Sequence, residues 1–419
     1  MTTSSVRSKF AADAARIALP HARAAILVRV KPLPMETVAL ARAIGRIVAR
    51  TYRASEDIVP FARSAMDGYA VRSSETAAAS VSSPKTLPIG DITFAGDGAT
   101  VLAQGSATAI TTGAMLPRGA DAVVPFEDVD RLGETIVLRA PLQSRDHIFE
   151  AGDDARAGDV LVPAGAMLTA GTLALLASAG IASVAVHRRA RVAIVSTGNE
   201  IVAIETTPRN GEIRNSNATM LAAALAADGA KVVSISHARD DAALVRATLV
   251  RALAEADLVV TTGGASTGER DFVKRTLREL GADFAFDSIA MRPSKPTGFA
   301  TLGSTAIAVL PGNPAAAYVA YVALVRGMLR RFAGALDAYP TPVEATLRGT
   351  VRAKPNRHFL MFARLAARSG RLEVTPLENQ CSSLVRTSAD ANALVVVGPG
   401  DAVYVPGNLV SCEVIGALA

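Results

Sequence analysis

The spacing of apolar residues changes several times along the chain, and each change predicts a different kind of element. Residues 8–55 carry apolar side chains at helical spacing, broken by Pro32 and Pro34, and we predict helix there. From 86 to 140, short apolar runs alternate with glycine turns, which is typical of short strands. Residues 149–186 contain further turns and a predicted helix near 170–179, and we expect them to pack against the early helices.

Between about 190 and 335 the pattern alternates between strands and helices. Apolar runs predict strands at 192–195, 231–235, 258–262 and 305–310, and helices are predicted near 217–228 and 240–255. This alternation predicts a mainly parallel sheet with helices on both faces. The residues after 335 return to short strands and turns.

These patterns predict an α/β multidomain fold, and a chain of 419 residues is long enough for several domains. An elongated N-terminal domain of helices and linkers would comprise residues 1–55 and 145–186. A β-rich domain, 56–144, would be inserted between its two halves. A central α/β domain with a mostly parallel sheet would follow at 187–335, and a C-terminal β domain at 336–419.

Composition narrows the class of protein and its compartment. Half of the residues are hydrophobic, but only 4% are aromatic and none is tryptophan, so the core must be mainly aliphatic. The net charge of +6 is spread along the chain without a long basic run, which argues against a nucleic-acid partner. The two cysteines lie far apart and outside any CxxC motif, which fits a reducing compartment.

No stretch of the sequence predicts a secretory signal or a membrane span. Asp13 and Arg16 interrupt any early apolar run. Residues 167–186 carry no charge, but they are rich in small residues and divided by Gly180, so we predict a buried helix followed by a strand. We therefore expect a cytoplasmic protein without a membrane partner.

Three polar, glycine-containing turns follow predicted strands of the α/β domain. They contain Ser196, Thr197, Gly198 and Glu200; Gly263, Gly264, Ser266 and Gly268; and Pro311, Gly312 and Asn313. Ligands of open parallel sheets bind at the carboxyl ends of strands, where glycine backbones and helix starts hold anions. Chain reversal alone explains any single turn, but three turns at one sheet edge favour a site for a phosphate-bearing ligand.

Charged residues lie next to these turns. Asp271 and Lys274 follow the glycine pair, and a proline-flanked loop between two predicted strands carries Arg292 and Lys295. Arginine and lysine suit an anion, because charge-assisted hydrogen bonds are strong. Carboxylates such as Glu200 and Asp271 suit Mg²⁺, which prefers oxygen ligands. The residues themselves thus indicate an anion site, with or without a metal.

One string outside this domain, 64–71, is unusual because Asp67 stands between a methionine and a Gly-Tyr pair. With other strings it forms a pattern that resembles the molybdopterin molybdenumtransferase family, which includes the MoeA proteins and the C-terminal domain of gephyrin. The matching strings are 64–71, 112–114, 119–123, 196–200, 215–217, 263–264 with 268 and 271, 291–297 and 310–314, with a weaker match at 382–384.

The resemblance implies an enzyme that acts late in molybdenum cofactor synthesis. Its substrates would be adenylylated molybdopterin and molybdate, and its reaction would release AMP in a Mg²⁺-dependent step. It also implies an elongated four-domain subunit and a homodimer whose site lies in a cleft formed by both chains. Further expected partners are molybdopterin adenylyltransferase and the downstream molybdoenzymes or their chaperones.

The resemblance also implies roles for individual residues. The family's functional acidic and hydroxyl positions match Asp67, Thr112, Glu200, Asp240 and Asp271. Glu200 and Asp271 would lie in the nucleotide and metal region, whereas Asp67 and Thr112 would complete the cleft from the β-rich domain. Arg292 and Lys295 would contact molybdate or phosphate, and Arg357 and Ser383 would line the cleft.

Two departures from the family's pattern bear on activity. Ser288 stands where many members have lysine, and Asn199 stands where the first glycine turn commonly has aspartate. The first change is expected to weaken oxyanion binding, and the second to remove a metal ligand. Two other functions stay open: a molybdopterin adenylyltransferase, which would be much shorter, and a non-catalytic molybdopterin-binding carrier or scaffold.

Overall fold

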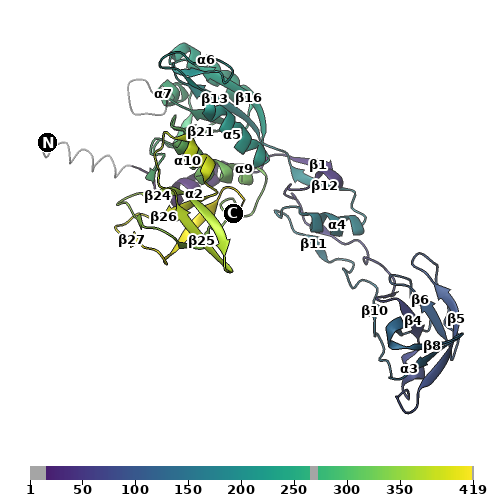
Figure 1. Cartoon of the computed structure of the whole chain (residues 1–419). Coiled ribbons are helices and arrows are strands. Elements are labelled where there is room, and N and C mark those ends of the chain that lie inside the picture. Colours follow the sequence, from purple (N-terminus) through teal and green to yellow (C-terminus); the bar gives the residue numbers. More distant parts are fainter. Residues whose placement is uncertain (1–15, 265–271, 418–419) are drawn as a thin grey trace.

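The computed structural model describes residues 16–264 and 272–417. Figure 1 shows an elongated molecule, with the α/β part and the C-terminal β domain at one end and a small β-rich unit at the other. A slender segment that contains β1 (Met35–Ala39), β12 (Ser183–His187) and α4 (Ala170–Ser178) connects the two ends. No helix in the described ranges is both long and apolar enough to cross a bilayer.

The centre of the α/β part is a six-stranded sheet in the order β16-β13-β17-β21-β20-β18. The strands are β13 (Arg191–Thr197), β16 (Lys231–Ala238), β17 (Leu258–Thr262), β18 (Asp283–Phe286), β20 (Gly298–Leu302) and β21 (Thr305–Leu310). The first four strands in the sheet order are parallel, and β20 pairs antiparallel with both of its neighbours. The prediction of a mostly parallel central sheet is confirmed.

Helices cover both faces of this sheet. They are α5 (Ser216–Ala227), α6 (Ala242–Glu255), α7 (Phe272–Glu279), α8 (Pro314–Ala320), a π-helical turn (Tyr321–Val325) and α9 (Arg326–Phe332). Along β13, Val192 and Ile194 belong to one hydrophobic core, and Ala193 and Val195 belong to the core on the opposite face. A strand buried on both sides needs apolar residues at every position, which explains the continuous apolar runs of the sequence.

The prediction of helix throughout 8–55 is wrong for most of the described part of that range. Only α2 (Leu19–Arg29) is α-helical, and after Pro32 and Pro34 the chain enters β1, which pairs antiparallel with β12. A proline cannot donate the backbone hydrogen bond that would continue a helix. The partner strand lies about 150 residues away, so the local spacing of apolar residues could not reveal the pairing.

The rest of this slender segment consists of short pairings between its two sequence halves. A 3₁₀ turn (Leu40–Arg42) follows β1, β2 (Tyr52–Arg53) pairs with β11 (Val160–Val162), and β3 (Arg63–Ser64) pairs with β10 (Ile148–Phe149). The helix α4 begins at a capping box, in which Thr169 and Thr172 satisfy each other's backbone N–H groups. The two halves therefore form one structural unit.

The β-rich unit is a six-stranded sheet in the order β7-β4-β6-β5-β9-β8. Its elements are β4 (Gly68–Val71), α3 (Ser73–Thr76), β5 (Lys85–Thr93), β6 (Ala107–Ile110), β7 (Ala122–Pro125), a 3₁₀ turn (Phe126–Asp128), β8 (Asp130–Leu132) and β9 (Thr135–Leu138). A Cβ atom on Gly68 would lie 2.0 Å from the Val124 carbonyl oxygen. Glycine after Asp67 is therefore a packing requirement of the β4–β7 pair.

The C-terminal β domain is a closed sheet in the order β19-β24-β25-β22-β28-β26, with β24 also paired to β26. The elements are β19 (Met291–Arg292), β22 (Val343–Leu347), β23 (Val351–Arg352), β24 (His358–Arg368), β25 (Arg371–Pro376), α10 (Val385–Asp390), β26 (Ala393–Val397), β27 (Val403–Tyr404) and β28 (Leu409–Val414). Because β19 comes from the α/β part of the sequence, its parallel pairing with β24 joins the basic loop to this domain.

Candidate functional site

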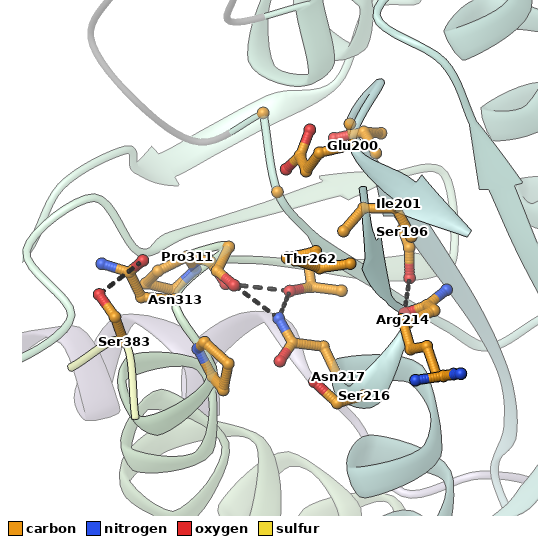
Figure 2. Close-up of a pocket in the computed structure, with 18 of the residues that line it drawn as sticks. Ser196, Glu200, Ile201, Arg214, Ser216, Asn217, Thr262, Pro311, Asn313 and Ser383 are labelled. Atoms are coloured by element: carbon orange, nitrogen blue, oxygen red, sulfur yellow. Dashed lines mark hydrogen bonds between the residues drawn. The ribbon is translucent and has the colours of Figure 1, made fainter. Parts of the chain in front are cut away.

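The three glycine-containing turns meet at the carboxyl ends of β13, β17 and β21 and line one cavity of about 1010 Å³. Its lining includes the predicted residues Ser196, Thr197, Gly198, Glu200, Asp240, Gly263, Gly264, Pro311, Gly312, Asn313 and Ser383. Figure 2 shows residues from all three turns and from the start of α5 around this space. The three turns that the sequence predicted at one edge of the sheet thus lie together in the structure.

The turns pack backbone against backbone. A Cβ atom on Gly263, whose φ is +92°, would lie 2.3 Å from the carbonyl oxygen of Thr197. A Cβ on Gly312 would lie 3.4 Å from the Gly263 Cα. These contacts leave no room for a side chain at Gly263 and hold the main chain of all three turns at the cavity, where backbone N–H groups suit an anion.

The start of α5 is fastened to the ends of all three strands. Asn215 caps the helix by accepting a hydrogen bond from the Ala218 N–H, and its Oδ1 also accepts from Ser196 Oγ at 3.2 Å. The Asn217 amide nitrogen donates to Thr262 Oγ1 and to the Gly312 carbonyl, both at 2.8 Å. Our sequence analysis assigned no site role to Asn217 or Thr262, although both line the cavity; the only signal was the family string 215–217.

Asn313 precedes α8 at the N-cap position, and Pro314 is the first helical residue. The Asn313 side chain makes no capping hydrogen bond, however. Its nitrogen donates to Ser382 Oγ at 3.3 Å, and its oxygen accepts from Ser383 Oγ at 3.4 Å, as Figure 2 shows for Ser383. The turn that contains Ser383 thereby connects the C-terminal domain to the cavity.

Two carboxylates stand at the cavity, Glu200 and Asp240. The Glu200 carboxylate lies over Gly198, where an added Cβ would be 2.7 Å from each of its oxygens. The Asn199 Oδ1 accepts a hydrogen bond from the Asp240 backbone N–H at 3.1 Å. Asparagine and aspartate can both accept this bond, so the departure at Asn199 preserves the support of Asp240.

The described residues contain no group of three or more His, Cys, Asp and Glu side chains that could enclose a metal ion. Ser266, Gly268 and Asp271, predicted as site residues, lie outside the described residues. Mg²⁺ in nucleotide enzymes is usually held by one or two carboxylates together with substrate phosphates. Glu200 with Asp240 fits that donor set, whereas a site made of protein ligands alone does not.

The predicted basic residues Arg292, Lys295 and Arg357 lie beside the cavity and do not line it, although Pro296 does. Burial, and then the positive charges of Arg16 and Arg357, lower the pKa of Lys295. The Arg292 guanidinium lies over the Phe359 ring, 5.6 Å from its centroid. Arg16, Lys295 and Arg357 therefore form a basic cluster that a bound anion would stabilise, and Arg292 lies in β19, close before Lys295 in the sequence.

Two further cations in this region received no site role from the sequence. Arg16 is held near the cluster by the next residue, Ile17, whose carbonyl accepts a hydrogen bond from the Ala290 N–H at 2.8 Å. Lys274 is buried, and its ammonium donates to the carbonyls of Asp287 and Pro296 at 2.8 and 3.1 Å. Lys274 thus holds both ends of the basic loop, a role that its position among charged residues did not indicate.

Asp67 and Thr112 lie together in the β-rich unit. The Thr112 N–H and hydroxyl donate to the same carboxylate oxygen of Asp67, at 2.6 and 2.9 Å. The backbone hydrogen bond, and then the hydroxyl bond, lower the pKa of Asp67 below its ordinary value. Neither residue lines the cavity of its own chain, because β4 and β6 lie at the opposite end of the molecule (Figure 1).

Family models match the chain along most of its length. Residues 17–180 match the MoeA N-terminal region (domains I and II), residues 193–331 a probable molybdopterin-binding domain, and residues 344–415 the MoeA C-terminal region (domain IV). A crystal structure of the molybdopterin biosynthesis MoeA protein from Pyrococcus horikoshii superposes with a TM-score of 0.78 at 30% identity. That superposition covers 96% of this chain and all of the other.

Two curated relatives carry the name molybdopterin molybdenumtransferase. The protein of Bacillus subtilis strain 168 is 35% identical over 389 residues, which is 91% of this chain and 90% of the relative. The protein of Staphylococcus aureus strain COL is 31% identical over 380 residues, which is 90% of each chain. With these matches and the cavity at the strand ends, the chain belongs to the molybdopterin molybdenumtransferase family of MoeA proteins.

Proposed function

We propose that this enzyme transfers molybdate to adenylylated molybdopterin in the cavity at the strand ends and releases AMP. The observation that carries the proposal is that glycine backbones and the starts of α5 and α8 line one wall, while a carboxylate pair stands on the same cavity. Helix starts and free N–H groups hold a pyrophosphate, and carboxylates recruit the metal that its cleavage requires. A volume of about 1010 Å³ accommodates a ligand of this size.

The basic cluster is the proposed site for the second substrate. Molybdate is a dianion, and Lys295, Arg292 and Arg357 supply positive charge beside Pro296, which reaches the cavity wall. Burial, and then the nearby charges of Arg16 and Arg357, lower the pKa of Lys295, and an anion beside its ammonium would favour the charged form. Ser383, held by Asn313, would donate its hydroxyl from the C-terminal domain side.

Mg²⁺ would be held by Glu200, with Asp240 and the substrate phosphates as further ligands, and would neutralise charge that develops as the phosphoanhydride breaks. Asp271 is proposed for the same region on the basis of the family resemblance. The protein's own part is to fix the phosphates through backbone N–H groups and to keep the two substrates adjacent.

We propose further that Asp67 and Thr112 act at the cavity of a second subunit in a homodimer. Both residues lie far from the cavity of their own chain, because the slender linking segment separates the β-rich unit from the α/β part (Figure 1). The hydrogen bonds from Thr112 lower the pKa of Asp67 and keep its carboxylate ionised, which suits a group that orients a cation. The enzyme would work as a cytoplasmic dimer.

Subunit mixing tests both parts of the proposal. Asp67→Asn and Glu200→Gln are each expected to abolish AMP release as homodimers. Mixed and re-equilibrated subunits should recover about a quarter of wild-type activity, because half of the dimers are mixed and each has one intact site under two-fold symmetry. Native mass spectrometry of the mixture checks that heterodimers form. Heterodimers without activity would show that the two residues do not complete one site across subunits.

A molybdopterin adenylyltransferase would consume ATP and make adenylylated molybdopterin. The β-rich unit and the C-terminal domain, both matched by MoeA models, speak for the transfer reaction instead. Incubation with ATP and molybdopterin separates the two activities: adenylate formation by this chain would overturn the proposal. A non-catalytic carrier would keep its function in the Asp67→Asn and Glu200→Gln variants when they are expressed in a molybdenumtransferase-deficient bacterium.

A further inference from the structure

Asn217 occupies the second position of α5 and is buried, with 8% of its surface exposed. Its amide nitrogen donates to Thr262 Oγ1 and to the Gly312 carbonyl, and Thr262 Oγ1 in turn donates to the Pro311 carbonyl at 2.9 Å. We infer that Asn217 is a positioning residue for the transfer reaction, which sets the direction in which the Gly312 and Asn313 N–H groups point. Figure 2 shows the hydrogen bonds that connect Asn217 and Thr262 with the turn at Pro311.

The argument rests on the planarity of the peptide bond. In a trans peptide the carbonyl of one residue and the N–H of the next point in opposite directions. The Pro311 and Gly312 carbonyls are both turned toward the Thr262–Asn217 pair, so the N–H groups of Gly312 and Asn313 must point away from it. Neither N–H has a hydrogen-bond acceptor among the residues that the structure describes, and both residues line the cavity.

The donor directions in this network are fixed. The Thr262 hydroxyl gives its one proton to the Pro311 carbonyl, so its oxygen must accept from Asn217. The Gly312 carbonyl can only accept. The side-chain nitrogen of Asn217 must therefore face both oxygens, and a carboxylate of the same shape would place an acceptor against two acceptors.

The two hydrogen bonds of the Asn217 nitrogen contribute to stability, but its oxygen does not. Its Oδ1 is buried and has no hydrogen-bond partner in the described part of the chain, which is unfavourable for a polar atom. Leucine, of similar size, would avoid that penalty, but it would leave Thr262 Oγ1 and the Gly312 carbonyl without the donor they have now. Asn217 thus leaves its own oxygen unsatisfied while its nitrogen helps to orient two carbonyls of the proposed phosphate-binding turn. This arrangement is expected if the residue serves the reaction.

The inference rests on the proposed use of the cavity as the substrate site, and its test starts with two substitutions at Asn217. Asn217→Leu is expected to fold, to lose thermal stability to an extent similar to the control below because two hydrogen bonds are removed, and to release AMP about 10- to 100-fold more slowly, as when one preorganised anion donor is lost. The KM for molybdate should change little, because the basic cluster is untouched. Asn392→Leu is the matched control, since Asn392 bonds both backbone groups of Leu365 in the C-terminal domain.

Asn217→Asp supplies a readout that a merely structural role would not move. A protonated aspartate can donate one of the two hydrogen bonds, whereas the carboxylate can donate neither. The activity of this variant relative to the wild type should therefore rise as the pH is lowered, at temperatures well below unfolding. A ratio that is flat with pH would overturn the inference.

Thr262→Val completes a double-mutant cycle with Asn217→Leu. Because the two side chains act through one network, the double variant should be little worse than Asn217→Leu alone. Full activity of Asn217→Leu, or losses that merely follow the thermal shift as in Asn392→Leu, would overturn the inference. If Asn217→Leu is active while Glu200→Gln is not, only this inference falls; if both are active, the assignment of the cavity falls as well.

Discussion

The close approach of the first two glycine turns gives the sharpest quantitative prediction. In Gly263→Ala the new methyl carbon would lie 2.3 Å from the Thr197 carbonyl oxygen and 2.9 Å from Thr197 Oγ1. Contacts between carbon and a carbonyl oxygen normally relax to about 3.3 Å or more, so the two turns must separate by roughly 1 Å. The positive φ of +92° adds strain of about 1–2 kcal/mol.

Gly281→Ala separates these two effects. Gly281 has a nearly equal φ of +86°, but nothing lies within 4 Å of an added Cβ. Its substitution should lower the free energy of unfolding by about 1–2 kcal/mol and leave catalysis unchanged. Gly263→Ala should show at least that loss of stability together with a fall of about 100-fold in kcat/KM, because a displacement of about 1 Å at a catalytic group has an effect of that size.

The assay is AMP release from adenylylated molybdopterin, measured below the unfolding midpoint of both variants, with thermal unfolding followed by circular dichroism. The reasoning predicts that activity separates the two variants more than stability does. Equal kcat/KM in the two variants, or wild-type kcat/KM in Gly263→Ala, would show that backbone packing of the turns does not position the substrate.

Three further predictions concern the charged groups. Glu200→Gln should leave only a trace of kcat at saturating Mg²⁺, and this residual activity should respond more weakly in a Mg²⁺ titration; an unchanged titration would exclude Glu200 from the metal region. Thr112→Val should raise the pKa of Asp67 toward its ordinary value of about 3.9 in an NMR titration, because the hydroxyl bond is lost and the backbone bond kept. Activity that depends on ionised Asp67 would then be lost at a higher pH as the solution is acidified. An unmoved pKa would show that the Thr112 hydroxyl does not stabilise the ionised carboxylate through this hydrogen bond. Ser288→Lys should lower the KM for molybdate, and the same KM in both proteins would show that Ser288 does not weaken oxyanion binding.

Much of the central fold could be predicted from the sequence because its signals are local. The strands predicted at 258–262 and 305–310 coincide with β17 and β21, since a strand buried on both faces is a continuous apolar run. The N-terminal prediction failed because β1 is stabilised by β12, and that pairing depends on residues far away in the sequence.

In the candidate site, too, the residues with a local signal could be predicted, and those whose role depends on distant partners could not. Glycine turns after strands are local features, so the cavity walls at Gly198, Gly263 and Gly312 were predicted. Asn217 was missed because its importance lies in bonds to two other turns, and a buried asparagine near a helix start is otherwise an ordinary residue. The buried ammonium of Lys274 was missed for the same reason, since its acceptors are carbonyls of another loop.

The basic cluster shows why the rest of the site could not be predicted without a structure. Its charges come from three separate segments, and two backbone pairings bring them together: Ile17 with Ala290, and β19 with β24. Each pairing uses main-chain atoms, which leave no pattern in the side chains that could be recognised in a sequence. Yet these pairings decide the electrostatics, because Lys295 lies close enough to Arg16 and Arg357 for their charges to lower its pKa. A substitution that weakens the β19–β24 pairing should therefore weaken molybdate binding without touching a charged residue.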